Sequence, residues 1–201
     1  TTTGVSRGAQ LLKAMMAFRE LIVSETLSPE KTKTGFMCMY PYKWMFNSCR
    51  IPVTGEDVAK SYDPATHQHV VVIRNGHFFI VDLVNKLTGK ELSVAEIELQ
   101  LQRIVEDERT QQVNPVPIGS FTAANRDEWV KNREALLAGA TGEHNRKLLE
   151  LVESGIIVLN LDSTSPVTFQ ERGEAVYGGD ARNRFFDKQQ IVCLLYTSDA
   201  A

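Results

Sequence analysis

The chain has 201 residues, 43% of them hydrophobic and 23% charged, which suits one globular domain with a sizeable core or part of a larger one. Its 22 lysines and arginines nearly balance 25 aspartates and glutamates, so the formal net charge of -3 offers no basic surface for nucleic acid or an anionic membrane. We therefore expect no nucleic-acid partner. No apolar run approaches the ~20 residues that a membrane-spanning helix needs, so we expect no transmembrane segment.

The first part of the chain predicts two helices of different length. Between residues 4 and 26 apolar residues recur every three or four positions, which is typical of a helix that packs on a core. The residues of this stripe are Leu11, Leu12, Met15, Met16, Phe18, Leu21 and Ile22. Residues 39–47 predict a short aromatic helix whose first turn tolerates Pro41. We expect Arg50 near the carbonyl end of that helix, and Pro52 favours extended backbone just before it.

A β-hairpin is predicted farther along the chain. Residues 69–73 and 77–82 are rich in β-branched and aromatic side chains, and Asn75-Gly76 lies between them. Asn-Gly is the strongest short signal for a hairpin, because both central residues of its turn need a positive φ.

Three further helices are predicted from residues that typically begin or end a helix. Ser93 and Glu96 form a capping box at the start of a helix with an apolar stripe. Residues 125–128 contain a second, similar cap. Residues 143–153 form a third helix, which we expect Gly155 to close in the left-handed conformation.

After that helix, residues 156–161 are an apolar run that predicts a buried strand. Strands and helices do not alternate strictly enough along the chain for a doubly wound sheet. We therefore expect an α+β fold in which helices lie beside a mixed sheet.

None of the four histidines has the neighbours of a recognised catalytic or metal site. His144 follows Glu143, but this pair opens a predicted helix, where an acid complements the helix dipole. His67 and His69 could share a strand edge, yet no cysteine or acid is spaced to complete the three or four ligands of a zinc site. We expect His67 and His69 to be structural or exposed, and we expect no metal.

The cysteines indicate a reducing environment. Cys38 and Cys49 do not form a CxxC motif. Two unpaired cysteines in a chain of this size fit a reducing intracellular compartment better than a disulfide-stabilised secreted protein. The sequence does not distinguish cytosol, mitochondrion and peroxisome.

Four segments together resemble the choline/carnitine O-acyltransferase family, in the order in which that family carries them. Residues 183–188, Asn-Arg-Phe-Phe-Asp-Lys, run into the apolar pair 191–192 and resemble the first half of the family signature. Residues 42–52, with an aromatic helix leading into Asn-Ser-Cys-Arg-Ile-Pro, resemble a second motif. Residues 70–79 resemble the family's hairpin, and residues 121–129 resemble its capped helix.

The resemblance implies reversible transfer of an acyl group between coenzyme A and the hydroxyl of carnitine or choline. The small-molecule partners would be carnitine and acyl-coenzyme A, with coenzyme A as a co-substrate and no prosthetic group. In the family a histidine acts as the general base, in a tunnel between two domains that are each folded like chloramphenicol acetyltransferase. Residues 1–192 would then be most of the N-terminal domain.

The catalytic histidine of the family lies in a Glu-His step that is followed closely by an acid and a glycine. No such step follows Val192, so we expect no catalytic residue in this chain, and we expect the chain alone to be inactive. The resemblance implies that Arg184 and Asp187 are a positioning pair for the histidine-bearing strand. Residues 189–190 are both glutamine, where the family has an apolar residue. The family's coenzyme A and carnitine contacts belong to its C-terminal domain, so no substrate-binding residue is assigned here.

The last nine residues, 193–201, need a separate explanation. They are the residues that the codons TGT CTC TTA TAC ACA TCT GAC GCT GCC encode, and this DNA resembles a transposase-type sequencing adapter read in frame. We expect Val192 to be the last native residue of this sequence and the remainder to be read-through. A natural polar tail is the alternative, and genomic DNA that encodes the tail would establish it.

Two alternatives stay open for function. The region 38–52 favours acetyl over long-chain transfer, and choline could replace carnitine as the acceptor. The contrasting hypothesis is a non-catalytic α+β domain that binds or scaffolds a protein partner, since these residues hold no complete catalytic set. The sequence downstream of Val192 discriminates between the enzyme and the binding domain.

Overall fold

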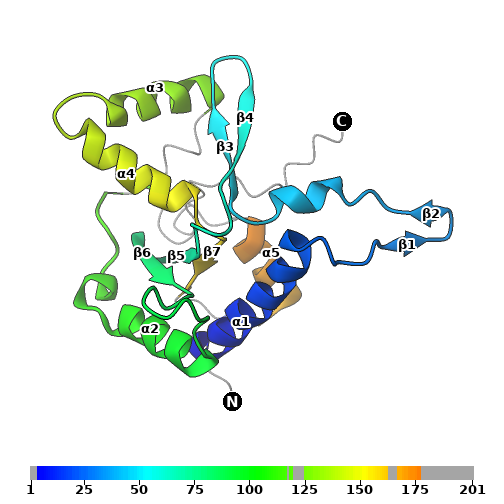
Figure 1. Cartoon of the computed structure of the whole chain (residues 1–201). Helices are drawn as coiled ribbons and strands as arrows, with labels where there is room; N and C mark the ends of the chain where they lie inside the picture. The colour runs from blue at the N-terminus through cyan, green and yellow to red at the C-terminus, as the bar shows by residue number, and fades with distance from the viewer. Residues whose placement is uncertain (1–3, 117, 120–124, 163–166, 178–201) are drawn as a thin grey trace.

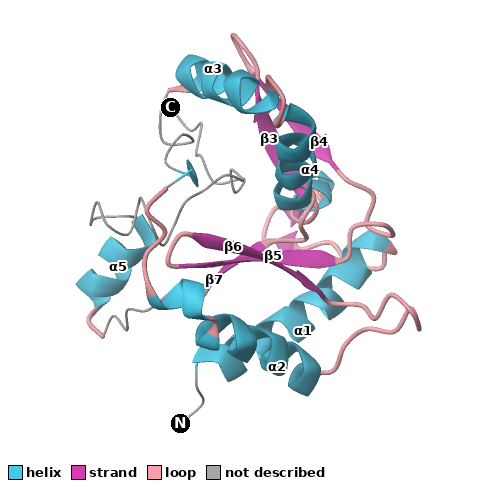
Figure 2. Cartoon of the chain, turned by 90° about the vertical axis from the view of Figure 1, so that its left-hand side faces the viewer, coloured by secondary structure: helices cyan, strands magenta, loops and turns pink. Residues whose placement is uncertain are grey.

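A three-stranded mixed sheet, in the order β6-β5-β7, lies at the centre of the computed structural model (Figure 2). The structure describes residues 4–116, 118–119, 125–162 and 167–177. Strand β5 (His69–Arg74) pairs antiparallel with β6 (His77–Asp82) and parallel with β7 (Val158–Asn160). Asn75 and Gly76 join the first two strands with φ of 46° and 76°, so the predicted hairpin is confirmed.

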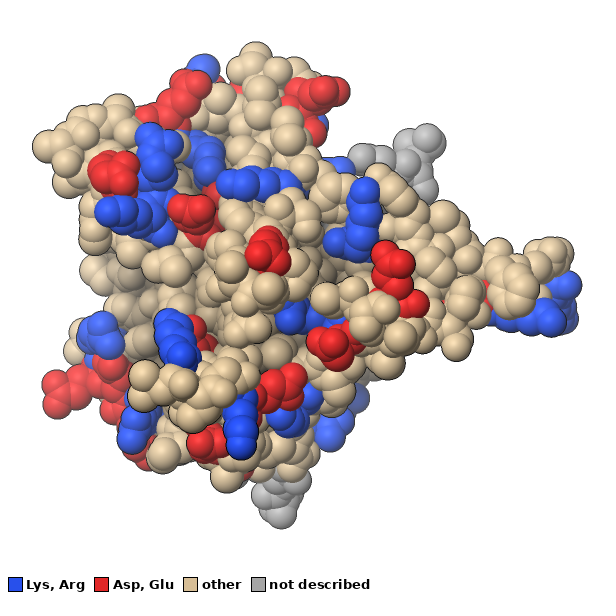
Figure 3. Space-filling model, in the orientation of Figure 1, with Lys and Arg blue, Asp and Glu red and all other residues tan. Residues whose placement is uncertain are grey.

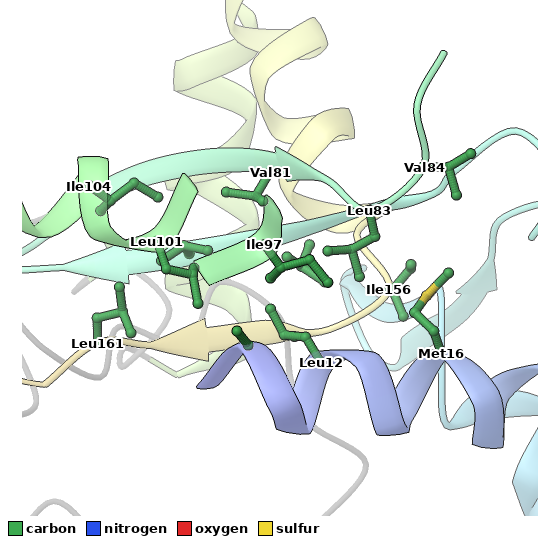
Figure 4. Packing of buried hydrophobic residues seen from close by; sticks show 13 residues of the cluster. Leu12, Met16, Val81, Leu83, Val84, Ile97, Leu101, Ile104, Ile156 and Leu161 are labelled. Atoms are coloured by element: carbon green, nitrogen blue, oxygen red, sulfur yellow. The ribbon is translucent and has the colours of Figure 1, made fainter. Parts of the chain in front are cut away.

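The hydrophobic core lies between this sheet and two helices, α1 (Gly4–Val23) and α2 (Val94–Glu106), that cover one of its faces (Figures 2 and 4). Residues 69–73 of β5 are all buried, so this central strand is covered on both faces. Alternate residues of the strand face the two helices, as the pleat requires. The buried members of this core cluster are Ala9, Leu12, Met16, Val70, Val72, Val81, Leu83, Val84, Ile97, Leu101, Ile104, Ile156 and Leu161.

Helices α2 and α3 begin where their capping residues predict. Ser93 caps α2 with the full capping box, since its Oγ accepts from the Glu96 N–H and the Glu96 carboxylate accepts from the Ser93 N–H. Asn125 caps α3 by accepting from the Glu128 N–H at 3.0 Å. The remaining bounds are α3 Arg126–Leu137, α4 Gly142–Glu153, α5 Phe169–Tyr177 and the 3-10 helix η2 Glu108–Gln111.

The segment between α1 and the sheet forms two small hairpins and a short helix (Figure 1). The predicted aromatic helix is a 3-10 helix, η1 (Tyr40–Trp44), with Pro41 in its first turn. The sequence did not predict the hairpins, whose strands are β1 Lys31–Thr32, β2 Gly35–Phe36, β3 Ser48–Pro52 and β4 Asp57–Ser61. The β1–β2 hairpin projects from the body, and β3–β4 rises beside α3 (Figure 1).

Helices α1 and α2 lie on one side of the central sheet, and the α3–α4 hairpin lies on the other (Figure 2). A mixed sheet with helices packed beside it is an α+β arrangement, so the predicted fold class is confirmed.

Three local expectations are wrong. Arg50 does not lie at a helix end but in β3, where its guanidinium is 3.6 Å from the Asp57 carboxylate of β4. Gly155 is not left-handed; a side chain there would meet Val71 of β5 at 2.9 Å, so close packing explains the glycine. Leu11 and Leu21 belong to the predicted apolar stripe of α1, yet both are exposed.

Candidate functional site

Asn47 joins three segments that are distant in the sequence. It is 1% exposed and has a φ of 50°, in the left-handed region that asparagine tolerates better than most residues. Its Nδ2 donates to the backbone oxygens of His67 and Ser154, both at 2.9 Å, and its Oδ1 accepts from Nε of Arg19 at 3.0 Å. One side chain thus ties α1 to the start of β5 and to the end of α4.

A buried ion pair lies close to this residue. Nη1 of Arg133, from α3, donates to one carboxylate oxygen of Glu153, and the Tyr62 hydroxyl donates to the other at 3.2 Å. The Glu153 side chain is only 6% exposed. Glu153 is the last residue of α4, where the helix dipole disfavours an acid. Arg133 and Tyr62 therefore stabilise its negative charge.

Arg19, Asn47, Tyr62, Arg133 and Glu153 are together called the polar junction below. Burial and the Glu153 carboxylate raise the pKa of the Tyr62 phenol, and burial lowers the pKa of the Arg19 guanidinium. Neither shift produces a base or a nucleophile near neutral pH. The polar junction can therefore hold helices and strands together, but its groups are not poised for proton transfer.

Cys49 lies beside the junction, and its thiol is expected to be unreactive in the folded protein. Burial, followed by the Glu153 charge, raises the pKa of Cys49 to about 12, so its thiolate fraction at pH 8 is roughly a thousandfold below that of an ordinary thiol. Cys38 is exposed and free. Brief treatment with iodoacetamide followed by peptide mass mapping should show Cys38 alkylated and Cys49 intact, whereas both should react in urea. Equal labelling of the two in buffer would contradict this burial.

His67 and His69 occupy structural or exposed positions, as the sequence predicts. His69 is buried, and its Nε2 donates to the Leu151 carbonyl at 2.7 Å. His67 contacts the Asp63 carbonyl through Nδ1 at 3.1 Å. His77 contacts the Gln112 carbonyl at 3.2 Å, and His144 is exposed in the first turn of α4.

The residues predicted to position the catalytic histidine, Arg184 and Asp187, lie outside the described residues, as do residues 121–124 of one family motif and the tail 193–201. Across the described ranges, no three histidine, cysteine or acidic side chains converge to hold a metal ion. The described helices include none that is long and apolar enough to cross a membrane.

A model of the family described as choline/carnitine O-acyltransferase matches residues 1–196. The match covers almost the whole chain. The chain belongs to the choline/carnitine O-acyltransferase family.

Curated members of several kinds align with this acyltransferase-family chain. Human carnitine O-acetyltransferase is 28% identical over 194 residues, which are 90% of this chain and 30% of that protein. Choline O-acetyltransferase of Drosophila melanogaster is 31% identical over 222 residues, covering 92% of this chain and 30% of that enzyme. Mitochondrial carnitine O-palmitoyltransferase 2 of Bos taurus is 33% identical over 150 residues, covering 75% of this chain and 21% of that enzyme. The chain thus spans under a third of the length of these relatives.

The structure shows which elements are formed by two of the segments that resemble the family. Residues 42–52 supply η1, Asn47 of the polar junction and strand β3, while residues 70–79 supply the buried β5 and the turn into β6. Both segments build the frame of the domain. On the face drawn in Figure 3, basic and acidic side chains are interspersed without a large region of one sign.

Sequence reasoning missed Asn47 and Glu153 as organising residues. Two signals could have found them. An asparagine directly after an aromatic helix is a candidate for left-handed backbone. An acid in the last turn of an amphipathic helix opposes the helix dipole, which indicates a compensating cation.

Proposed function

We propose that the chain is part of an enzyme that transfers an acyl group between coenzyme A and the hydroxyl of carnitine. The observation that carries the proposal is the family match over residues 1–196. In this mechanism a histidine beyond Val192 removes the proton from the carnitine hydroxyl, which then attacks the thioester carbonyl. Hydroxyl donors stabilise the oxyanion that forms, and the coenzyme A thiolate leaves.

The positions of the described histidines support a base elsewhere in the protein. Three of the four contact backbone carbonyl groups through a ring nitrogen, and His144 is exposed on α4. A general base must reach its substrate proton in a site that holds both reactants. The cavity beside η1 and the cavity beside α4, both formed by described residues, have no histidine in their lining. Under this proposal Arg184 and Asp187 orient the strand that carries the base.

Acetyl is the acyl group we propose, on the basis of residues 38–52. A longer acyl group is the second candidate, because the bovine palmitoyltransferase aligns with this chain at 33% identity. Choline is the alternative acceptor, since the fruit-fly choline O-acetyltransferase aligns at 31% identity.

An assay of the whole protein separates these candidates. The chain extended past Val192 would be given acetyl- or palmitoyl-coenzyme A with either carnitine or choline, and release of free thiol would be followed. Acetyl-coenzyme A with carnitine is expected to give the largest kcat/KM. A larger value with palmitoyl-coenzyme A or with choline would replace the proposed substrate, and no transfer with any pair would favour a non-catalytic binding domain.

A further inference from the structure

A cavity of about 700 Å³ lies between the C-terminal end of α1, the segment that follows it, and η1. This volume falls in the range of roughly 300–1,000 Å³ that is typical of small-molecule sites. The walls are mainly aliphatic and aromatic. Their apolar and aromatic residues are Leu21, Ile22, Val23, Leu27, Pro29, Met39, Tyr40, Tyr42, Phe46 and Pro64.

Arg19 lines this cavity and brings a buried charge to it. Its side chain bonds only neutral acceptors: Nε donates to Oδ1 of Asn47 at 3.0 Å, and Nη2 donates to the Pro64 carbonyl at 2.7 Å. Among the residues that the structure describes, no carboxylate lies within ion-pair distance of this guanidinium. Its Nη1 has no hydrogen-bond partner among these residues, and this nitrogen is not completely buried. Arg19 is nonetheless only 5% exposed, so Nη1 is the donor that a molecule in the cavity can reach.

A second cation stands in the cavity wall. Nζ of Lys43 lies 3.9 Å from the ring centre of Tyr40 and 4.5 Å from that of Trp44, so cation–π contacts hold it beside the apolar wall. Glu25 is the one carboxylate that lines the cavity. Two cations and one acid give the described lining a net charge of +1, which complements an anion.

We propose that this cavity binds a small amphipathic carboxylate, with its charged group toward Arg19 and Lys43 and its aliphatic or aromatic body against the apolar walls. Nη1 of the desolvated Arg19 guanidinium can donate a charge-assisted hydrogen bond to a carboxylate, which is stronger than a bond to a neutral acceptor. The apolar lining excludes water from the remainder of such a ligand. This inference goes beyond the proposed acyl transfer and does not depend on it, because the test measures binding alone.

Octanoate is the probe, with octylammonium and octanol as matched ligands of opposite and zero charge. Titration of the whole chain, followed by calorimetry and by fluorescence of the nearby Trp44, is expected to show saturable octanoate binding. Octanol should bind at least about threefold more weakly and octylammonium more weakly still. Equal affinity for octanoate and octanol, tighter binding of octylammonium, or no saturable octanoate binding would each overturn the proposal.

Variants locate the binding without relying on the structural Arg19. Leu21→Trp fills the cavity from a half-exposed position and is expected to weaken octanoate binding at least about tenfold. Leu87→Trp, on a 96% exposed side chain outside the cavity, should leave it unchanged. Lys43→Gln should weaken octanoate about threefold and leave octanol unaffected, whereas Lys86→Gln should change neither. Binding that survives Leu21→Trp, or that Leu87→Trp weakens equally, would place the ligand elsewhere and end the proposal.

Discussion

Arg133→Met is expected to destabilise the fold by about 3 kcal/mol. The substitution leaves the Glu153 carboxylate almost fully buried, with the Tyr62 hydroxyl as its remaining hydrogen-bond partner among the described residues. Removing one member of a buried ion pair typically costs about 3–5 kcal/mol, and the partial exposure of Arg133 places this case at the low end. Urea unfolding, followed by circular dichroism, measures the change in the free energy of unfolding.

Lys131→Met is the matched control on the same helix. Its partner Glu128 is at 2.9 Å, but both side chains are more than half exposed, so a loss below about 0.5 kcal/mol is expected. Similar losses in the two variants would mean that the Arg133–Glu153 pair is solvated, contrary to the buried junction. The double variant Arg133→Met with Glu153→Leu should recover part of the stability, because it leaves no unpaired charge.

Asn47→Gly is expected to cost a similar amount, about 3 kcal/mol. Glycine keeps the left-handed backbone available, so the loss reports the side chain, which makes two bonds to carbonyls and one with Arg19. Each neutral bond contributes about 0.5–1.5 kcal/mol, and the bond from the charged Arg19 contributes more. Urea unfolding again provides the measurement.

Asn75→Gly provides the comparison. Asn75 also has a positive φ, of 46°, and its side chain donates one bond, to the Thr110 carbonyl at 2.7 Å. This variant should lose about 1 kcal/mol or less. If it costs as much as Asn47→Gly, the effect comes from the shared asparagine-to-glycine change and not from the bonds that Asn47 makes.

Features encoded by a few neighbouring residues were predicted well. The turn at Asn75-Gly76 and the caps at Ser93 and Asn125 are each specified within four residues, because the bonds that define them are local. The resemblance to the family was also read from short motifs, and the family match over residues 1–196 confirms it.

Features that depend on contacts distant in sequence were missed. Gly155 owes its identity to Val71, and the position of Arg50 follows from pairing of β3 with β4. Asn47 of the polar junction donates to the carbonyl of Ser154, which lies 107 residues farther along the chain. Local propensity contains no information on such pairs, since tertiary packing selects them.

We propose that these residues form part of an acyltransferase whose base lies beyond Val192. The most direct test compares the 201-residue chain with a protein that continues through the natural downstream sequence, both assayed for thiol release from acetyl-coenzyme A with carnitine. We predict activity only in the longer protein, and its loss by at least about a thousandfold when the histidine of the first downstream Glu-His step is changed to alanine. Turnover by the shorter chain, or a longer protein that stays active without that histidine, would contradict the account.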